Sequence, residues 1–262
     1  MKRPLAELIG KAAMNTAADV VLLAECEQPE NEILAALNHQ TGKTFHNAHP
    51  LSIKIRVYSS LTAGTIHPVA VYDNGRISIQ RLILERTDIL LVAVHLPSKM
   101  NRDDSDQVQE AVGLSSNIRR AELDYGHTRT ILVGDLNMNP FDPGVVGAMG
   151  LHGVMTRAIA TERTRKVDGQ DYHFFYNPMW GLLGDRTPGP AGTHYIRLGK
   201  PTEYFWNTYD QVMIRPELLG NFDDDVRVLT EVGGINFLTA NGHPNRNQHS
   251  DHLPLSFPLN ID

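Results

Sequence analysis

Two polar residues at the end of a short apolar run are the best candidates for chemistry in this sequence. The run Ile131–Val133 lacks helical spacing and predicts a buried strand. Gly134 lets the backbone bend or approach a ligand, and Asp135 and Asn137 follow it. On an extended chain, residues two apart point to the same face, so this carboxylate and carboxamide would meet a cation or a phosphoryl oxygen together. The same residues also favour a simple Asx-type turn, which is the competing interpretation.

Other predicted strands also carry acidic or imidazole side chains near their ends. These are Glu25 after the segment 19–24, His95 in the segment 88–96, Asp210 in the segment 202–214, and Asp251 and His252 in the segment 250–257. Each alone is explained by an exposed loop acid or a paired buried group. Together they offer oxygen ligands that suit Mg²⁺ or Mn²⁺. The single cysteine, Cys26, argues against a structural zinc site built from cysteines.

The elements that must position these groups alternate between helix and strand. Helical spacing covers residues 4–17 and 29–38, a long helix begins at Asp103 or Asp104 and ends near Tyr125, and a short helix begins after Asp142. The remaining predicted strands cover residues 52–59, 69–72, 77–84, 129–133, 172–176 and 226–230, with a hairpin turn at 73–75 and polar loops at 181–193 and 241–249. This alternation predicts a layered α/β fold, with residues 1–262 as a single domain.

The composition narrows the function class. The net charge is −6 and the pI is near 6.0, which argues against a protein that coats nucleic acid but allows a nuclease with a local basic rim. No segment has the apolar length of a transmembrane helix, and the N-terminal residues lack an export signal. One cysteine fits a reducing compartment, so we expect a cytoplasmic protein.

Five short motifs resemble, in order, those of the endonuclease/exonuclease/phosphatase (deoxyribonuclease I-like) superfamily. They are Leu23-Ala-Glu25, His95-Leu-Pro-Ser98, Gly134-Asp-Leu-Asn137, Tyr209-Asp-Gln-Val212 and Ser250-Asp-His-Leu-Pro254. The superfamily includes deoxyribonuclease I, exonuclease III-type abasic endonucleases, inositol polyphosphate 5-phosphatases, bacterial sphingomyelinases and deadenylases. The resemblance implies a four-layer α/β sandwich, with two facing mixed sheets and helices outside.

The resemblance also implies a role for each residue that matches a motif. Glu25 would hold a divalent metal, Mg²⁺ or Mn²⁺, and Asp251 would be a second ligand of the metal or of its water. Asp135 would position or deprotonate the attacking water, and Asn137 would bind the scissile phosphate.

The remaining roles fall to one acid and two imidazoles. His252 would stabilise the charge that develops on the phosphorus, with Asp210 orienting its ring. His95 would contact the phosphate or protonate the leaving oxygen. These roles describe a phosphodiester hydrolase that uses in-line attack by water, with an endo- or exonuclease as the first choice and no obligate protein partner.

One feature departs from the family pattern. The family begins with a strand that carries an asparagine, whereas this sequence begins with the helix that normally follows. Asn15 lies within that helix and is a poor substitute. Without the first strand, the edge of the neighbouring strand would be exposed. A non-catalytic binding module of the same fold is therefore an alternative.

The substrate is less constrained by the sequence. Lys99 is placed either to reach a phosphate or to lie in solvent. Phe174, Phe175, Tyr176 and Trp180 would either stack on a base or, as burial preferences favour, pack in the core. Arg163, Arg165 and Lys166 form a basic cluster that would meet a nucleic-acid backbone or simply be solvated. A phosphatase or phosphodiesterase of a small molecule or lipid headgroup is the second enzymatic interpretation.

Overall fold

The computed structural model describes residues 5–49, 51–52, 54–99 and 103–261. The helices are α1 (Leu5–Asn15), α2 (Glu30–Thr41), α3 (Asp104–Tyr125), α4 (Pro143–Val146) and α5 (Arg157–Ala160), with 3₁₀ turns at Asp73–Gly75, Pro178–Leu182 and Pro216–Asn221. Pro4, the predicted start of the first helix, and Ile53, within the predicted strand 52–59, lie outside the described residues.

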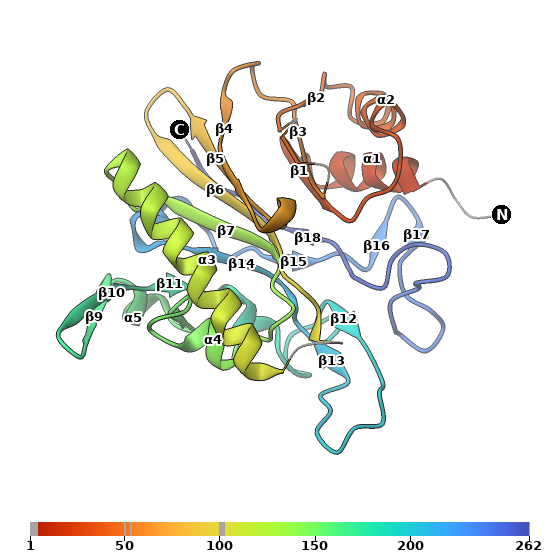
Figure 1. The fold of residues 1–262 in the computed structure, drawn as a ribbon. Helices are drawn as coiled ribbons and strands as arrows, with labels where there is room; N and C mark the ends of the chain where they lie inside the picture. The colour runs from red at the N-terminus through yellow and green to blue at the C-terminus, as the bar shows by residue number, and fades with distance from the viewer. Residues whose placement is uncertain (1–4, 50, 53, 100–102, 262) are drawn as a thin grey trace.

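A seven-stranded mixed sheet forms the centre of the fold (Figure 1). Its order is β4 (Ile66–Tyr72), β5 (Ile77–Ile83), β6 (Asp88–His95), β7 (Thr130–Asp135), β14 (Asp210–Ile214), β11 (Phe175–Tyr176) and β8 (Gly153–Val154). β6 and β7 are parallel, and helix α3 makes the crossover between them. The predicted hairpin at residues 73–75 is confirmed, since it joins antiparallel β4 and β5 through Asn74 and Gly75, both at positive φ.

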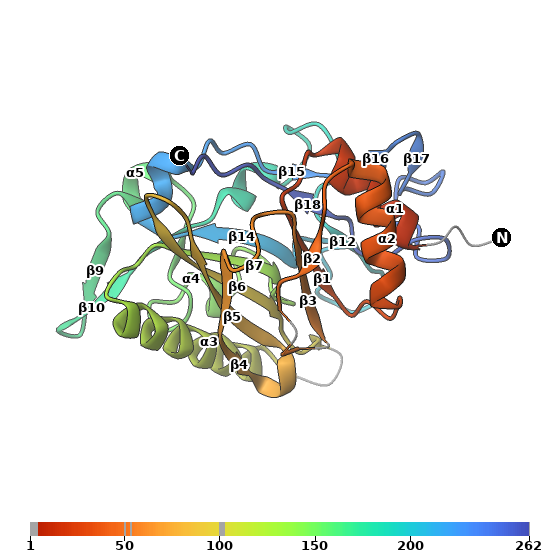
Figure 2. The ribbon, with the colours of Figure 1, turned by 90° about the horizontal axis from the view of Figure 1, so that it is seen from above.

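A second, smaller sheet faces the first (Figure 2). It contains β1 (Val20–Ala24), β3 (Ile55–Ser59) and β2 (His46–Asn47) in the order β1-β3-β2, and the short pair β15 (Arg227–Val228) and β18 (Leu255–Ser256) lies on the same side. The sheet is antiparallel throughout, so the prediction of two mixed sheets is wrong in this detail. Among the described residues, β1 pairs with β3 alone, and its outer edge has no strand partner.

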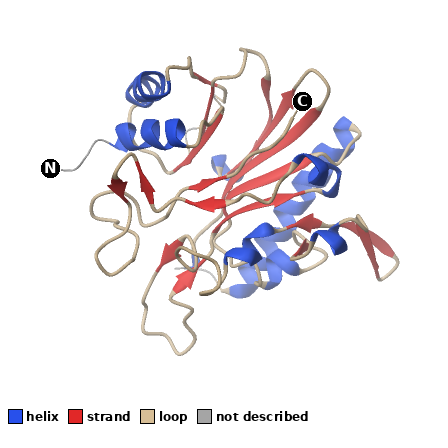
Figure 3. Ribbon diagram, turned by 180° about the vertical axis from the view of Figure 1, so that it is seen from behind, coloured by secondary structure: helices blue, strands red, loops and turns tan. Residues whose placement is uncertain are grey.

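Alternating side chains divide the core into layers, as the two-residue period of a strand requires. On β6 and β7, Leu91 and Ile131 face the small sheet, where they pack with Val57 of β3. Their neighbours Val92 and Leu132 face the other way and pack under α3. A third cluster fills the space between the small sheet and α1 and α2. The helix–sheet–sheet–helix order of the predicted four-layer sandwich is therefore confirmed (Figure 3).

The remaining strands are short pairs at the periphery. They are β9 (Thr164–Val167) with β10 (Gln170–His173), β12 (His194–Tyr195) with β13 (Trp206–Asn207), and β16 (Glu231–Val232) with β17 (Ile235–Asn236). The predicted strand 172–176 is split, because Tyr172 and His173 pair with β9 while Phe175 and Tyr176 join the large sheet. The predicted strand 202–214 begins as an irregular segment, and its long continuous part is β14.

The last predicted strand, residues 250–257, is reduced to β18. The amide of Leu253 donates to the Thr193 carbonyl 2.8 Å away rather than to β15, and Pro254 has no amide hydrogen to give. Ladder pairing with β15 therefore starts only at Leu255. The predicted long helix is confirmed as α3, with Asp103 as its N-cap in a reciprocal capping box with Asp106.

Candidate active site

Three neighbouring strands of the large sheet place polar side chains in one row: β6 and β7 end there, and antiparallel β14 begins there. In the β6–β7 ladder His95 is paired with Asp135, and in the β7–β14 ladder Asp135 is paired with Asp210. Residues directly opposite one another in a sheet project to the same face. The sheet therefore brings an imidazole and two carboxylates together, and Nε2 of His95 lies 3.6 Å from Oδ2 of Asp135.

Asp210 and His252 form a hydrogen-bonded ion pair. Nδ1 of His252 lies 2.7 Å from Oδ2 of Asp210, as the sequence predicted. Burial by itself lowers the pKa of His252, but the hydrogen bond and charge of Asp210, with the charge of Asp135, raise it to about 9. Burial pushes the pKa of Asp210 upward, and the His252 contact overcomes this and holds it below the ordinary value. The pair is therefore ionised at neutral pH.

Asp135 is a buried carboxyl with an unusual charge state. Asp135 is 7% exposed. Its burial, and secondly the negative charge of Asp210, raise the pKa of its carboxyl group to about 7. The positive charge of His252 and the amide of Asn137 oppose this rise. Asp135 is thus poised to exchange a proton near neutral pH.

Asn137 is held against Asp135 by a turn. Its amide N–H donates to Oδ1 of Asp135 at 2.7 Å, and its φ is 50°. Its side-chain Nδ2 donates to the carbonyl of Leu96 at 2.8 Å and to Oδ2 of Asp135 at 3.1 Å. The expected extended geometry is therefore wrong and the Asx-type turn is right, because the turn aims the amide inward, where both of its hydrogens are used.

Glu25 reaches the same row from the small sheet. It follows β1 at a φ of 50°, and its amide donates to the Lys54 carbonyl 3.1 Å away. Its Oε1 lies 3.7 Å from Nδ1 of His95, although 73% of the Glu25 side chain is exposed. Burial lowers the pKa of His95, and the charge of Glu25 opposes this effect. His95 therefore lies between a carboxylate from each sheet.

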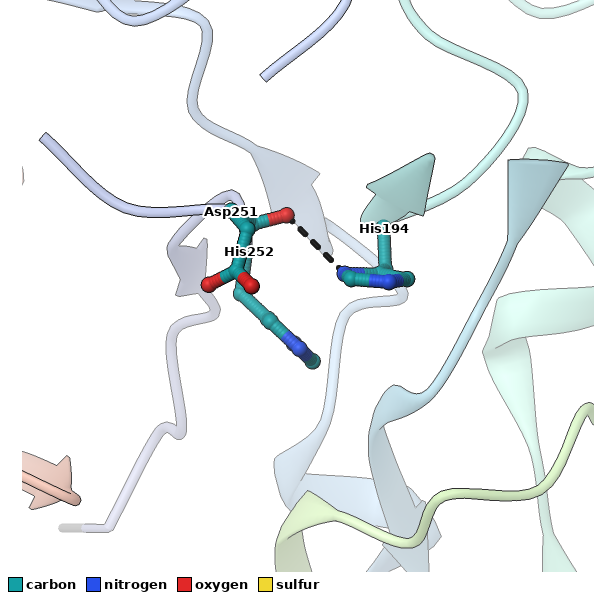
Figure 4. A group of neighbouring side chains, drawn as sticks. All are labelled: His194, Asp251 and His252. Atoms are coloured by element: carbon teal, nitrogen blue, oxygen red, sulfur yellow. Dashed lines mark hydrogen bonds between the residues drawn. The ribbon is translucent and has the colours of Figure 1, made fainter. Parts of the chain in front are cut away.

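His194 joins the site although the sequence analysis did not single it out. It lies on β12 and forms an isolated antiparallel bridge with His252, and the two ring centroids are 4.4 Å apart. Its Nδ1 donates to the backbone carbonyl of Asp251 at 3.0 Å (Figure 4). Burial, and then the positive charge of His252, lower the pKa of His194. No motif marks this position, because a tertiary bridge brings together residues 58 apart in sequence.

Asp251 is exposed next to His252, so its carboxylate is open to solvent. The six residues expected to converge therefore do so, from strand ends of both sheets and from the segment that leads into β18: Glu25, Asp135, Asn137, Asp210, Asp251 and His252.

A network of buried amides supports this arrangement from behind. Asn139 donates to Oδ1 of Asn207 at 3.0 Å and accepts from the amide of Thr208 at 2.9 Å. Gln211 donates to the Met138 carbonyl at 2.6 Å. These bonds fix the loop after β7 against the segment that leads into β14. The sequence analysis did not predict these hydrogen bonds, since amide side chains give no periodic signal.

Two other residues singled out in the sequence, Lys99 and Asn15, have different surroundings. Lys99 is paired and partly exposed: its Nζ lies 2.7 Å from Oδ2 of Asp142, and 31% of its side chain is exposed. Asp142 therefore precedes α4 without a side-chain capping bond to it. Asn15 is exposed at the end of α1.

The aromatic and basic groups are also accounted for. Phe174, Phe175 and Tyr176 are buried, which confirms the core interpretation, and half-buried Trp180 packs edge-on against Phe141. The basic cluster of Arg163, Arg165 and Lys166 lies at the β9–β10 hairpin, far from β12 in Figure 1.

Comparison with known proteins gives a likeness of fold. No family model and no curated protein matches the chain. Among solved structures, D. rerio TDP2 in complex with a single-strand DNA product has 12% identity and a TM-score of 0.55, over 95% of this chain and 89% of that one. The endonuclease domain of TRAS1, a telomere-specific non-LTR retrotransposon, has 14% identity and a TM-score of 0.50, over 99% and 94%. The 3′ phosphatase NExo from Neisseria, bound to a product DNA hairpin, has 12% identity and a TM-score of 0.51, over 93% and 89%. At these identities the likeness shows the fold alone: the chain has the fold of the endonuclease/exonuclease/phosphatase, or deoxyribonuclease I-like, superfamily.

Proposed function

We propose that this protein is a divalent-metal-dependent phosphodiester hydrolase that cleaves nucleic acid by in-line attack of water. The observation that carries the proposal is the ionised Asp210–His252 pair beside Asp135, a carboxyl with a pKa of about 7. One group can then donate hydrogen bonds to a phosphoryl oxygen while another accepts a proton from water. The neighbours of like fold are named for work on DNA or as an endonuclease, which supports nucleic acid as the substrate.

The chain's own residues divide the chemistry. Asp135 accepts the proton of the attacking water, since its pKa of about 7 matches a general base at neutral pH. Asn137, which the resemblance implies would bind the scissile phosphate, has both amide hydrogens in use and instead keeps that carboxylate oriented. His252, held by Asp210, presents its Nε2 proton to the phosphoryl oxygen on which charge develops. His95 contacts the phosphate from the other side of Asp135 or protonates the leaving oxygen.

The donor set of the site fits Mg²⁺ or Mn²⁺. Glu25 and Asp251 offer exposed carboxylate oxygens, the ligands that hard divalent cations prefer. The negative charges of Asp210 and Glu25 contribute to the raised pKa of Asp135, so the site carries carboxylate charge that a cation would offset. When bound, the metal would supply positive charge to the phosphoryl oxygens. Glu25 and Asp251 are the residues that would hold it.

A small-molecule or headgroup phosphoesterase is the second candidate. The basic cluster at residues 163–166 lies away from the site, so this cluster does not form a rim for a long nucleic-acid backbone. The third alternative is a non-catalytic binding module of the same fold. The activity assay described below tests it.

We further propose that residues 1–262 act as one domain in the cytoplasm. Glu25 and His252, near the two ends of the sequence, are drawn into one site, and Cys26 is buried and unpaired. Within the described ranges, no helix is long and apolar enough to cross a membrane.

One substrate panel tests the proposed function. It contains abasic duplex DNA, single-stranded DNA, RNA, inositol phosphates and sphingomyelin, each with Mg²⁺, with Mn²⁺ and with EDTA. We expect hydrolysis of a nucleic acid that EDTA abolishes and that Asp135→Asn removes, while His243→Phe, at a histidine outside the row, retains it. Hydrolysis of inositol phosphates or sphingomyelin alone would favour the second candidate. No hydrolysis of any substrate, by a protein that is folded and metal-loaded, would favour the binding module.

A further inference from the structure

A cluster of two imidazoles and one carboxylate lies at the outer side of the row. His194, Asp251 and His252 each offer a potential ligand atom, and these three atoms lie within 4.8 Å of one another. Figure 4 shows the ring of His194, carried by β12, facing the Asp251–His252 dipeptide. The divalent metal proposed for hydrolysis uses Glu25 and Asp251, so the two histidines are not accounted for as ligands there.

The backbone fixes the two rings side by side. His194 and His252 are opposite each other in an antiparallel bridge, and the amide of Leu253 donates to the Thr193 carbonyl at 2.8 Å. Their ring centroids are 4.4 Å apart, and His194 also stacks on Tyr209 at 5.6 Å. The two imidazoles are therefore positioned by main-chain contacts and ring packing.

Each ring is also oriented by an oxygen acceptor at its Nδ1. His194 donates to the Asp251 carbonyl at 3.0 Å, and Nδ1 of His252 lies 2.7 Å from the Asp210 carboxylate. Neither Nε2 has a hydrogen bond to another described residue. Metal-binding histidines typically show this arrangement, in which an oxygen behind the ring fixes the tautomer and leaves the other nitrogen for the metal.

We propose that His194, Asp251 and His252 form a binding site for a transition metal of the Zn²⁺ type. Two imidazoles and a carboxylate match the ligand preference of Zn²⁺ and not that of Mg²⁺, which prefers oxygen. Metal–ligand bonds of about 2.1 Å place tetrahedral ligands roughly 3.4 Å apart. Side chains whose ligand atoms start within 4.8 Å therefore need to close by little more than an ångström.

The site would make Zn²⁺ an inhibitor of the proposed reaction. Zn²⁺ at this site would displace the Nε2 proton of His252 to solvent, and it would share Asp251 with the metal proposed for hydrolysis. This consequence rests on the proposed function, whereas binding itself does not. The two are therefore tested separately, with binding measured on the full chain in the absence of any substrate.

The test is a calorimetric titration of Zn²⁺ into the full chain in excess Mg²⁺. We expect one Zn²⁺ per chain, and His194→Phe should weaken binding by about tenfold or more, because it keeps the stacked ring but removes both nitrogens. His243→Phe is the matched control, since His243 stacks on Tyr195, the residue after His194, without belonging to the cluster. Glu25→Gln should not weaken Zn²⁺ binding, because Glu25 belongs to the competing Mg²⁺ site and not to the cluster.

Three results would overturn the proposal: no Zn²⁺ binding by the unmodified chain, equal affinity in His194→Phe, or a loss in Glu25→Gln as large as that in His194→Phe. Thermal unfolding of each variant without metal confirms that it is folded, and His194→Gln replaces His194→Phe if the latter is not. Zn²⁺ that binds without affecting hydrolysis would leave the site standing and count against the assigned role of His252.

Discussion

The inner and outer halves of the candidate site are built differently. The inner half consists of His95 and Asp135 on adjacent strands of the large sheet and Asn137 in the turn after β7, and each of these residues is 6–8% exposed. The outer half, with Glu25 and Asp251, comes from the end of a strand in the small sheet and from a loop, and both side chains are largely exposed. The difference indicates that the inner groups are fixed by folding while the outer groups are left for a ligand.

The asymmetry has a physical origin in hydrogen bonding. Removing an inner polar group leaves its buried partner unsatisfied, which typically destabilises a protein by about 1–3 kcal/mol. An exposed carboxylate is replaced by water at little loss, and surface substitutions usually change stability by less than about 0.5 kcal/mol. Substitutions in the two halves should therefore separate: inner ones affect stability and chemistry, and outer ones affect metal binding.

The largest effect is expected where the two halves meet, at Asp210 and His252. Asp210→Asn and His252→Ala should each lower kcat/KM by about 10²–10⁴-fold, the usual range for a positioned acid or base. Because the two side chains share one hydrogen bond, the double variant should be little worse than the worse single variant. Strictly multiplicative losses would show that they act independently.

The second-largest effect is expected on the Mg²⁺ requirement, and only from substitutions in the outer half. Glu25→Gln should raise the Mg²⁺ concentration needed for half-maximal activity by about tenfold or more, since it removes the charge of a proposed ligand and keeps its shape. Its thermal midpoint should match that of the unmodified chain, because 73% of the side chain is exposed. An unchanged Mg²⁺ titration would remove Glu25 from the metal site.

The stability effect of the inner half can be measured at Asn137. Asn137→Ala should reduce the free energy of unfolding by about 1–3 kcal/mol, because the Leu96 carbonyl and Oδ2 of Asp135 both lose the side-chain amide donor. Asn15→Ala, at an exposed position, is the control and should have little effect. Denaturant unfolding in EDTA separates this change from metal binding. Equal stability of the two variants would mean that the turn does not hold the inner half.

A smaller effect is expected on stability at alkaline pH, through the His252 ring. The folded pKa of His252, about 9, lies above its ordinary value of 6.5, so its stabilising contribution is complete below pH 6.5 and is lost as the pH rises toward 9. We expect a loss on the order of 1 kcal/mol, or about 2–4 °C in Tm for a protein of this size. Asp210→Asn should flatten this slope. A slope that is unchanged in this variant would assign it to other groups.

His152, a buried histidine outside the site, should make stability depend on pH in the opposite direction, with a loss at acid pH. Burial, and then the charge of Arg165, lower the pKa of His152 to about 4, so its contribution is present above pH 6.5 and is lost as the pH falls toward 4. His152→Phe preserves the contact with Phe174 and should reduce the acid sensitivity of unfolding. Equal acid sensitivity in both proteins would contradict this assignment.

Some parts of the site could be predicted from the sequence because local signals mark them. Strand-end positions at His95 and Asp135 are readable because a buried strand leaves a continuous apolar run before its polar end, whereas Asp210 precedes the apolar part of its strand. The bounds of α3 are readable because its cap is a local sequence signal. The positions of His95 and Asp135 and the layered α/β class could therefore be predicted from local patterns, whereas the four-layer order was implied by the family resemblance.

Other parts depend on tertiary contacts and could not be predicted. The left-handed turn at Asn137 is stabilised by the Leu96 carbonyl, 41 positions away in sequence. His194 enters the site through a bridge with His252 that has no period or motif. The short β18 results from competition between Thr193 and β15 for the same stretch of backbone. Each of these outcomes depends on a distant partner.

The central claim is that the fold itself prepares an ionised Asp210–His252 pair next to a carboxyl poised near neutral pH. The most direct test is an NMR titration of the histidine ring signals in the metal-free full chain, with Asp210→Asn as the comparison. We predict that His252 titrates near pH 9 and His95 below its ordinary value, and that Asp210→Asn lowers the pKa of His252 by more than about one unit. A His252 that titrates near 6.5 in the unmodified chain, with no change in Asp210→Asn, would contradict the account.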